Sequence, residues 1–332
     1  MKGFGWFKKK EQKAATRQVP AATVQTQVPA PKTNLRRKNN IEAFQDTMSR
    51  MEQDPVLKKR AEDSAGRTLV YAAHTLPEKS PSAKASRVVV QEATTVQAAR
   101  ELKKMYARVA LLNFANPLEP GGGVLRGANT QEESLCRART LYPCLVGPCA
   151  AEYYRYHQDM PRIGNCFLNS DRLVYSPDVT FFKEEVSPDP FDDQLHLELC
   201  YTDDWFTTDV ITCAAPYFPA GQLPIAESEL RNILIERIQN ILECAIDQDA
   251  EALVLGAFGC GAFHNPPMVV ADAFRTVLLQ PRYRNAFEEI RFAIKRTDPF
   301  FCPNIEAFEI KLSAFPEECL FSEERNKRRF FE

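Results

Sequence analysis

Long apolar runs are absent from this chain of 332 residues, and their absence argues against two classes of protein. No run approaches the roughly 18 apolar residues of a helix that crosses a membrane. The opening stretch, MKGFGWFKKKEQKAATRQ, contains no apolar segment of the kind that directs secretion. We therefore expect an intracellular, cytoplasmic protein with no membrane partner.

The sequence also lacks the short ligand spacings that are typical of metal sites. Ten cysteines occur without an export signal, which predicts reduced thiols rather than disulfides. Cys136, Cys144 and Cys149 are not spaced as CxxC pairs, and no HxxxH motif accompanies them. We expect neither a bound metal nor a cofactor.

Glycine is scarce, with 13 in the chain, and none of it forms the GxxxxGK[ST] loop of kinases and ATPases. Three glycines nevertheless stand together at 121–123, and three more lie at positions 256, 259 and 261. The second group does not fit the dinucleotide-binding fingerprint. Glycine allows close approach of the backbone to a ligand and positive φ angles, so both clusters are candidate binding loops.

Positive charge is concentrated at the start of the chain. Residues 1–40 hold ten Lys or Arg and one acid, a net charge of +9, whereas the whole chain carries −2. An acidic body does not suit a broad nucleic-acid surface. We expect residues 1–39 to be a disordered basic extension, either simply solvated or an electrostatic tether to an anionic polymer such as nucleic acid.

Apolar periodicity predicts strands that alternate with helices, and therefore an α/β fold with a mixed sheet. Helical spacing begins near Asn40 and returns over 94–107, 130–142, 227–246 and 268–279. The expected strands lie at 68–74, 87–91, 108–114, 171–176, 179–184, 207–215, 251–257 and 288–296. The pattern weakens after Pro303, so we expect a folded domain over 40–302 and a charged tail over 303–332.

Two glycine-rich loops each follow an expected strand and precede an expected helix, at 113–130 and 256–267. Ligands of α/β sheets gather at the carboxyl ends of strands. Backbone N–H groups and the positive ends of the following helices favour an anion there. Each loop alone could be only a tight turn, but the pair together favours a diphosphate.

Glu132 and Glu133 stand side by side where the first loop enters its helix. Neighbouring helical residues point about 100° apart, so the two carboxylates have different tasks. Glu133 could merely close a capping box with Thr130. A carboxylate beside an anion-binding loop would repel phosphates, however, and this indicates action on a neutral part of the same ligand, such as a sugar.

The segment GGG, then seven residues, then QEE resembles the signature of the poly(ADP-ribose) glycohydrolases. The words NFANPLEPGGG, QEESLCRARTLYPCL, LVYSPDV and GAFGCGAFHNPP are similar to the microbial type of that family, over about residues 40–298. The resemblance implies a macrodomain-like mixed sheet flanked by helices, here with a helical N-terminal extension. One departure is Tyr217, which stands where the family pattern leads us to expect asparagine.

The resemblance also assigns roles by position. Glu133 corresponds to the family's essential acid, and Glu132 corresponds to the residue that positions the ribose at the bond to be broken. The residues that would contact the ligand are Asn116, Gly121, Gly122, Gly123, Gln131, Gly259, Cys260, Gly261, Ala262 and Phe263. The first loop would lie against ribose and phosphates, and the second would donate N–H groups to the diphosphate.

The function that the resemblance implies is hydrolysis of the ribose–ribose O-glycosidic bond of poly(ADP-ribose), in an exo mode that releases ADP-ribose. Its partners would be poly(ADP-ribose), ADP-ribose and ADP-ribosylated proteins. Two alternatives stay open: a macrodomain that binds ADP-ribose without cutting it, and a mono-ADP-ribosyl hydrolase that uses the same pocket. An intact QEE argues against the first of these.

Overall fold

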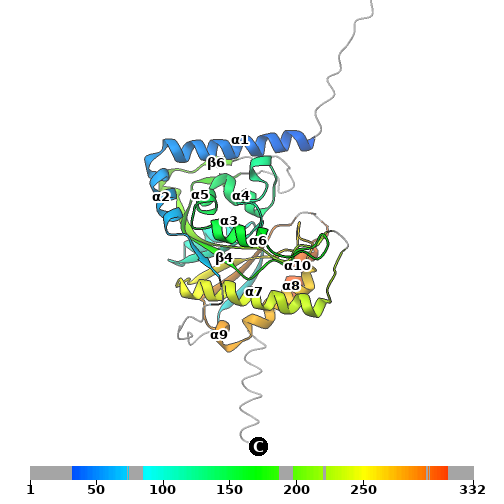
Figure 1. Cartoon of the computed structure of the whole chain (residues 1–332). Coiled ribbons are helices and arrows are strands. Elements are labelled where there is room, and N and C mark those ends of the chain that lie inside the picture. Colours follow the sequence, from blue (N-terminus) through cyan, green and yellow to red (C-terminus); the bar gives the residue numbers. More distant parts are fainter. Residues whose placement is uncertain are drawn as a thin grey trace, which may run out of the picture.

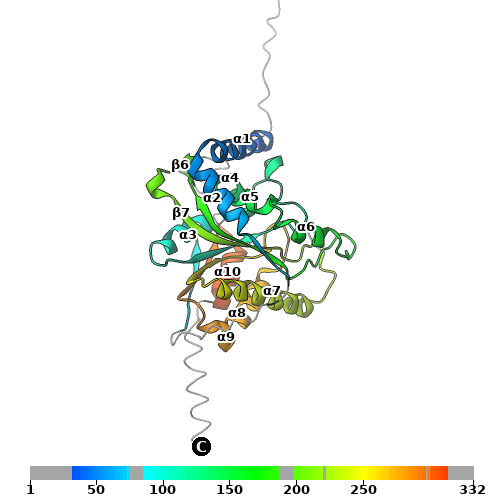
Figure 2. The same cartoon turned by 60° about the vertical axis from the view of Figure 1, so that its left-hand side comes forward.

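A seven-stranded mixed sheet forms the centre of the computed structural model, with helices on both faces (Figures 1 and 2). The structure describes residues 32–72, 74, 85–186, 197–219, 222–296, 298 and 300–312. The strands, in sheet order, are β1 (Leu69–Tyr71), β4 (Leu173–Phe181), β7 (Phe206–Cys213), β3 (Val109–Phe114), β8 (Ala252–Leu255), β9 (Glu289–Ile294) and β2 (Arg87–Glu92). The predicted α/β class with a mixed sheet is confirmed.

The helices divide into two layers around this sheet. The first layer contains α1 (Lys32–Gln53), α2 (Pro55–Gly66), α3 (Thr95–Lys103), α4 (Gln131–Ala138), α5 (Leu141–Val146) and α6 (Ala151–Gln158). The second contains α7 (Glu227–Asp247), α8 (Pro267–Leu278), α9 (Pro281–Arg284) and α10 (Pro303–Leu312). A small hairpin of β5 (Lys183–Glu185) and β6 (Leu197–Leu199) lies near α1. No helix of these described segments has the length and apolar character to cross a membrane.

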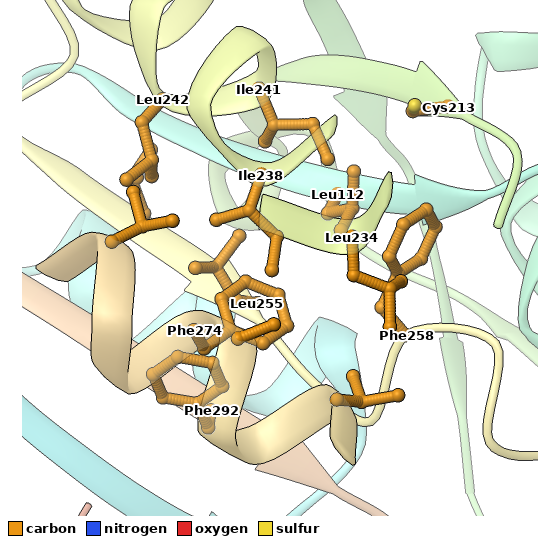
Figure 3. Packing of buried hydrophobic residues seen from close by; sticks show 14 of the residues in the cluster. Leu112, Cys213, Leu234, Ile238, Ile241, Leu242, Leu255, Phe258, Phe274 and Phe292 are labelled. Atoms are coloured by element: carbon orange, nitrogen blue, oxygen red, sulfur yellow. The ribbon is translucent and has the colours of Figure 1, made fainter. Parts of the chain in front are cut away.

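Five neighbouring strands, β7, β3, β8, β9 and β2, run parallel, and β4 joins β7 antiparallel. Strands covered on both faces read as continuous apolar runs, which is why VALLNF gave a clear prediction. Along β3, Leu111 faces the first helical layer and Leu112 faces the second. Figure 3 shows Leu112 and Leu255 packed against Leu234 and Ile238 of α7. The parallel arrangement brings five strand ends to one edge of the sheet.

The N-terminal helix α1 starts at Lys32, before the domain boundary that we expected at residue 40. Asn40 is fully buried, and its Nδ2 donates to the Gly127 carbonyl at 2.9 Å. Residues 32–39 therefore belong to a helix that reaches the folded body. The basic segment 1–31 lies outside the described residues.

The chain after Pro303 also differs from our expectation. Residues 303–312 form α10, in which Ile305, Phe308 and Leu312 are buried against α8 and β2. Their spacing of three and four residues places them on one helical face. The expected charged tail is therefore wrong for this segment, and 313–332 lie outside the described residues.

The helix predicted over 130–142 is divided in the structure. It ends at Ala138 because Arg139 is extended and forms an isolated bridge with Phe181. The N–H of Thr140 then donates to the Thr180 carbonyl at 3.1 Å. This pairing with β4 competes with helix formation and starts α5 as a separate element.

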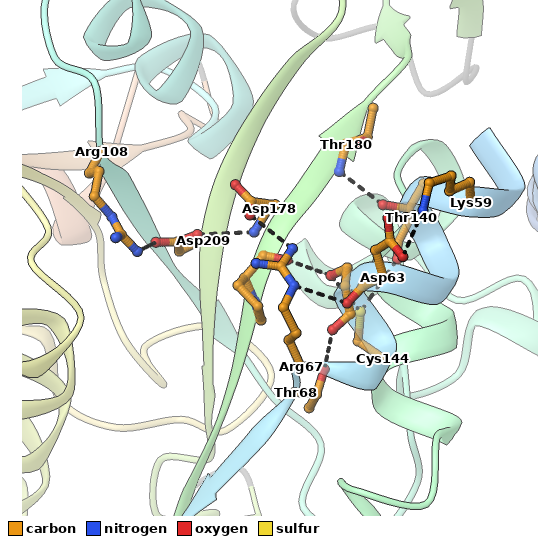
Figure 4. Close-up of polar contacts among 12 residues, drawn as sticks. Lys59, Asp63, Arg67, Thr68, Arg108, Thr140, Cys144, Asp178, Thr180 and Asp209 are labelled. Atoms are coloured by element: carbon orange, nitrogen blue, oxygen red, sulfur yellow. Dashed lines mark hydrogen bonds and ion pairs between the residues drawn. The ribbon is translucent and has the colours of Figure 1, made fainter. Parts of the chain in front are cut away.

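Two apolar runs that we expected to be separate strands join into β4 through a bulge at Pro177 and Asp178. Proline has no N–H for the ladder, and Asp178 has a φ of 50°. Figure 4 shows how Asp178 is held. Arg67 pairs with the Asp178 carboxylate at 2.9 Å, and the backbone N–H of Asp178 donates to the Asp209 carboxylate at 3.0 Å. The bulge keeps both halves in one sheet.

Candidate active site

A cleft of about 540 Å³ lies where the parallel strands β3, β7, β8, β9 and β2 end. Its walls come from the residues that follow these strands and from the start of α4. Of the residues that we expected to contact ligand, those that line it are Asn116, Gln131, Glu132, Glu133, Gly259, Gly261, Ala262 and Phe263. Gly121, Gly122, Gly123 and Cys260 do not line this cleft.

Gln131 fixes the start of α4 to the sheet. Its Oε1 accepts the N–H of Phe114 at 2.9 Å, and its Nε2 donates to the Leu112 carbonyl at 2.8 Å. A further contact joins Nε2 to the Thr95 hydroxyl at 3.3 Å, at the beginning of α3. The oxygen and the nitrogen of the Gln131 amide are therefore both hydrogen-bonded to protein groups. These bonds position the two glutamates that follow Gln131.

Glu133 is buried and is surrounded by hydrogen-bond donors. Its Oε1 accepts the N–H of Gly123 at 2.8 Å, and its Oε2 accepts the N–H of Thr130 at 2.7 Å. The Thr130 hydroxyl also donates to Oε2. The glutamate half of the predicted capping box is present, and it holds Glu133 while leaving that residue in the wall of the cleft.

Glu132 is more deeply buried, with 1% of its surface exposed. Its Oε2 accepts the N–H of Asn116 at 2.7 Å, and its Oε1 lies 3.4 Å from Nδ2 of Asn113. Burial raises the pKa of Glu132 to about 8; the Asn116 N–H opposes this shift, and the charge of Glu133 adds to it. Glu132 is therefore largely protonated at neutral pH.

Gly121 and Gly122 both have left-handed backbone conformations and close neighbours. Gly122 has a φ of 59°, and a Cβ atom there would lie 2.5 Å from Glu133 Oε1 and 2.9 Å from Glu132 Oε2. Gly121 has a φ of 69°, and its Cβ would lie 2.9 Å from the Tyr142 ring. Neither position leaves room for a side chain, because Gly122 packs on both carboxylates and Gly121 packs on Tyr142.

The second loop presents backbone donors to the cleft. Within the described part of the chain, the N–H groups of Gly259, Gly261, Ala262 and Phe263 have no intramolecular acceptor. The N–H of Cys260 differs from the expectation, because it donates to the Ala257 carbonyl at 3.1 Å inside the turn. A group of unpaired N–H donors is the arrangement that binds an oxyanion.

Asn265 holds this loop in shape, and the sequence analysis missed it. Its Nδ2 donates to the Pro216 carbonyl at 2.7 Å and to the Gly259 carbonyl at 3.0 Å. Gly259 has a φ of 74°, and a Cβ there would lie 2.5 Å from the same Nδ2. Nearby, the Tyr217 ring packs edge-on against the Phe263 ring, with 5.3 Å between the ring centroids. Tyr217, which departs from the family pattern, therefore supports the aromatic residue of the loop.

The polypeptide between the glycines and the glutamates is fixed by buried groups that the sequence did not indicate. Arg137 is 1% exposed and donates to the carbonyl of Ala128 and to the side chain of Asn129. Burial lowers its pKa to about 10, and the charge of Glu133 acts in the opposite direction. Thr47 of α1 donates to the Arg137 carbonyl, so the N-terminal helix also supports α4.

The described segments contain nine cysteines and no cluster of side chains suited to a metal ion. The nine cysteines there are free thiols, and Cys319 lies outside the described residues. No group of three or more His, Cys, Asp or Glu side chains within these segments is arranged to hold a metal ion.

Comparisons with known proteins agree with this architecture. Residues 10–184, more than half of the chain, match the family described as "Microbial-type PARG, catalytic domain". The poly(ADP-ribose) glycohydrolase (PARG) of Thermomonospora curvata has a similar structure, with a TM-score of 0.67, 28% identity, and coverage of 84% of this chain and 100% of that chain. The same figures apply to that protein bound to the inhibitor ADP-HPD.

The PARG of Deinococcus radiodurans in complex with ADP-ribose is also similar, with 31% identity and a TM-score of 0.62. The match covers 77% of this chain and 98% of that chain. Curated protein sequences gave no match. The family match covers more than half of the chain and the solved structures share its fold, and this chain therefore belongs to the microbial-type poly(ADP-ribose) glycohydrolases.

Proposed function

We propose that this chain hydrolyses the ribose–ribose O-glycosidic bond of poly(ADP-ribose) and releases ADP-ribose. One observation carries the proposal: two buried glutamates and a loop of unpaired N–H groups line the same cleft. The loop suits a diphosphate, and the glutamates suit the chemistry of an acetal carbon. Family membership supplies the substrate class.

The ligand's position follows from the chemistry of the walls. The diphosphate would accept hydrogen bonds from the N–H groups of the loop 259–263, and the distal ribose would lie beside Glu132 and Glu133. The remaining part of the cleft, around Val96 and Ile294, is apolar enough to hold adenosine. Asn116 lies on the glutamate side, consistent with contact to the distal ribose.

In the proposed reaction, the bond between the anomeric carbon of the terminal ribose and the departing hydroxyl oxygen breaks. Glu133 gives a proton to that oxygen, an oxocarbenium-like centre forms, and water attacks the anomeric carbon. The same carboxylate then takes a proton from the attacking water. General acid–base catalysis of this kind contributes about 10²–10⁴-fold.

The environments of the two glutamates explain where the required proton is held. Three donors surround the carboxylate of Glu133, whereas burial keeps a proton on Glu132 in the unliganded cleft. In the proposed reaction Glu132 passes this proton to Glu133 before cleavage. Until that transfer, neutral Glu132 does not repel the diphosphate as the ligand binds.

We place the cut at the terminal unit of the chain, as the family resemblance implies, and we expect ADP-ribosylated proteins to present the polymer. Incubation of the folded protein with poly(ADP-ribose), and separately with mono-ADP-ribosylated protein, tests the activity and its class. We expect free ADP-ribose from the polymer and little from the mono-modified protein. Unchanged polymer would favour a binding module, and release from the mono-modified protein alone would favour a mono-ADP-ribosyl hydrolase.

A further inference from the structure

An ion pair connects two walls of the cleft at some distance in sequence from the glutamate motif. Lys295 directly follows β9, and its Nζ lies 3.9 Å from Oε1 of Glu185 at the end of β5. Both residues line the cleft. The Lys295 side chain is 53% exposed and the Glu185 side chain 34%, so solvent reaches the pair.

The side chains that line the cleft are mostly acidic where they are charged. Among the described residues that line it, the acidic side chains are Glu132, Glu133 and Glu185, and the single cationic side chain is Lys295. A diphosphate carries negative charge of its own. The N–H groups of the second loop can hold its oxygens, but Lys295 is the one side chain there whose charge can neutralise them.

Lys295 is also close to the loop that carries those N–H groups. A Cβ on Gly256, the first residue of that loop, would lie 2.7 Å from the carbonyl oxygen of Ala293. The end of β9 therefore packs against the start of the loop, and Lys295 emerges two residues later. A flexible lysine at this place can reach either Glu185 or an anion held by the loop.

We propose that Lys295 exchanges partners on binding: it leaves Glu185 and pairs with the diphosphate of the ligand, and Glu185 competes with that ligand for the same cation. The inference rests on the proposed function, since it takes ADP-ribose as the ligand. Glu185 then weakens ligand binding in two ways. It holds Lys295 in the free protein, and its negative charge repels the diphosphate.

The magnitudes favour this exchange. A solvent-exposed ion pair contributes little to stability, so opening the contact with Glu185 costs little. A charge-assisted hydrogen bond to phosphate in a cleft is stronger than a surface ion pair. We expect Lys295→Met to weaken ADP-ribose binding roughly three- to tenfold, and Glu185→Gln to strengthen it roughly two- to fivefold.

Calorimetric titration of ADP-ribose into the full-length protein and its variants tests the exchange, at low salt and at high salt. A control variant, Lys59→Met, removes a lysine of the same charge that is also exposed and pairs with Asp63 on α2, outside the residues that line the cleft. The control should bind like the unmodified protein. Screening should weaken binding by the unmodified protein more than binding by Lys295→Met.

The opposite signs of the two effects make the result decisive. If Lys295 and Glu185 merely hold the walls together, both substitutions will weaken binding, and the exchange is refuted. Two variants that bind like the unmodified protein would refute it as well. If the unmodified protein fails to bind ADP-ribose at all, the proposed function itself fails, and the same titration reports that outcome separately.

Discussion

Substitution of Gly122 by alanine should disable the active site through the backbone of the glycine loop. The added Cβ would stand 2.5 Å from Glu133 Oε1, whereas ordinary contacts begin near 3.5 Å, so that carboxylate must retreat by roughly 1 Å. A displacement of this size at a catalytic group costs about 10²-fold in rate. We therefore expect Gly122→Ala to release ADP-ribose from polymer at least about a hundredfold more slowly.

The same substitution should also lower stability, for two separable reasons. Alanine in the left-handed region costs about 1–2 kcal/mol, and a lost hydrogen bond to a charged group costs about 1.5–3 kcal/mol. Gly164 provides a matched control, since it has a φ of 60° but no atom within 4 Å of its Cβ position. Gly164→Ala should show the backbone cost alone, about 1–2 kcal/mol.

Denaturant unfolding and polymer cleavage, measured on both variants, separate backbone strain from the collision with the glutamates. We expect Gly122→Ala to lose roughly 2.5–5 kcal/mol of unfolding free energy together with its activity. Gly164→Ala should keep activity close to that of the unmodified protein. A Gly122→Ala protein that cleaves polymer at the normal rate would refute the packing argument.

Three further predictions concern the supports of the site. The pKa of Glu132 in the folded protein is raised to about 8 from an ordinary 4.5, so the unfolding free energy of the unmodified protein should fall as pH rises between these values. Glu132→Gln should remove that loss, and equal pH slopes for the two proteins in unfolding experiments would contradict this. Asn113→Leu removes the side-chain donor beside Glu132, so it should lower kcat and shift the pH–rate profile. Asn240→Leu removes a buried asparagine on α7 instead, and it should change neither kcat nor the profile. Asn40→Ala should cost about 1–2 kcal/mol in unfolding free energy through the lost bond to the loop before α4, and an unchanged denaturation midpoint would show that α1 does not support it.

Local patterns in the sequence were enough to place the sheet and both loops. Continuous apolar runs identified β3 and β8, and helical spacing over 94–107 identified α3, which begins with a capping box between Thr94 and Gln97. These features depend on residues close together in the chain. The strand–loop–helix arrangement then placed both loops at the same edge of the sheet.

What the sequence could not show depends on contacts between distant segments. Asn40 and Gly127 are 87 residues apart, and no local pattern links α1 to the loop before α4. Arg137 reads as an ordinary exposed helical charge but is buried with partners in the preceding loop. The tight packing of Gly122 on the two glutamates also follows from tertiary structure alone.

In the proposed function, Glu133 carries the chemistry of poly(ADP-ribose) hydrolysis while the rest of the cleft binds the ligand. The most direct measurement compares Glu133→Gln with the unmodified protein, for release of ADP-ribose from polymer and for affinity toward ADP-ribose. The amide preserves the shape of the side chain but cannot shuttle a proton, so we expect turnover to vanish and affinity to stay within a few-fold. Cleavage near the wild-type rate by Glu133→Gln, or no cleavage by the unmodified protein, would contradict the account.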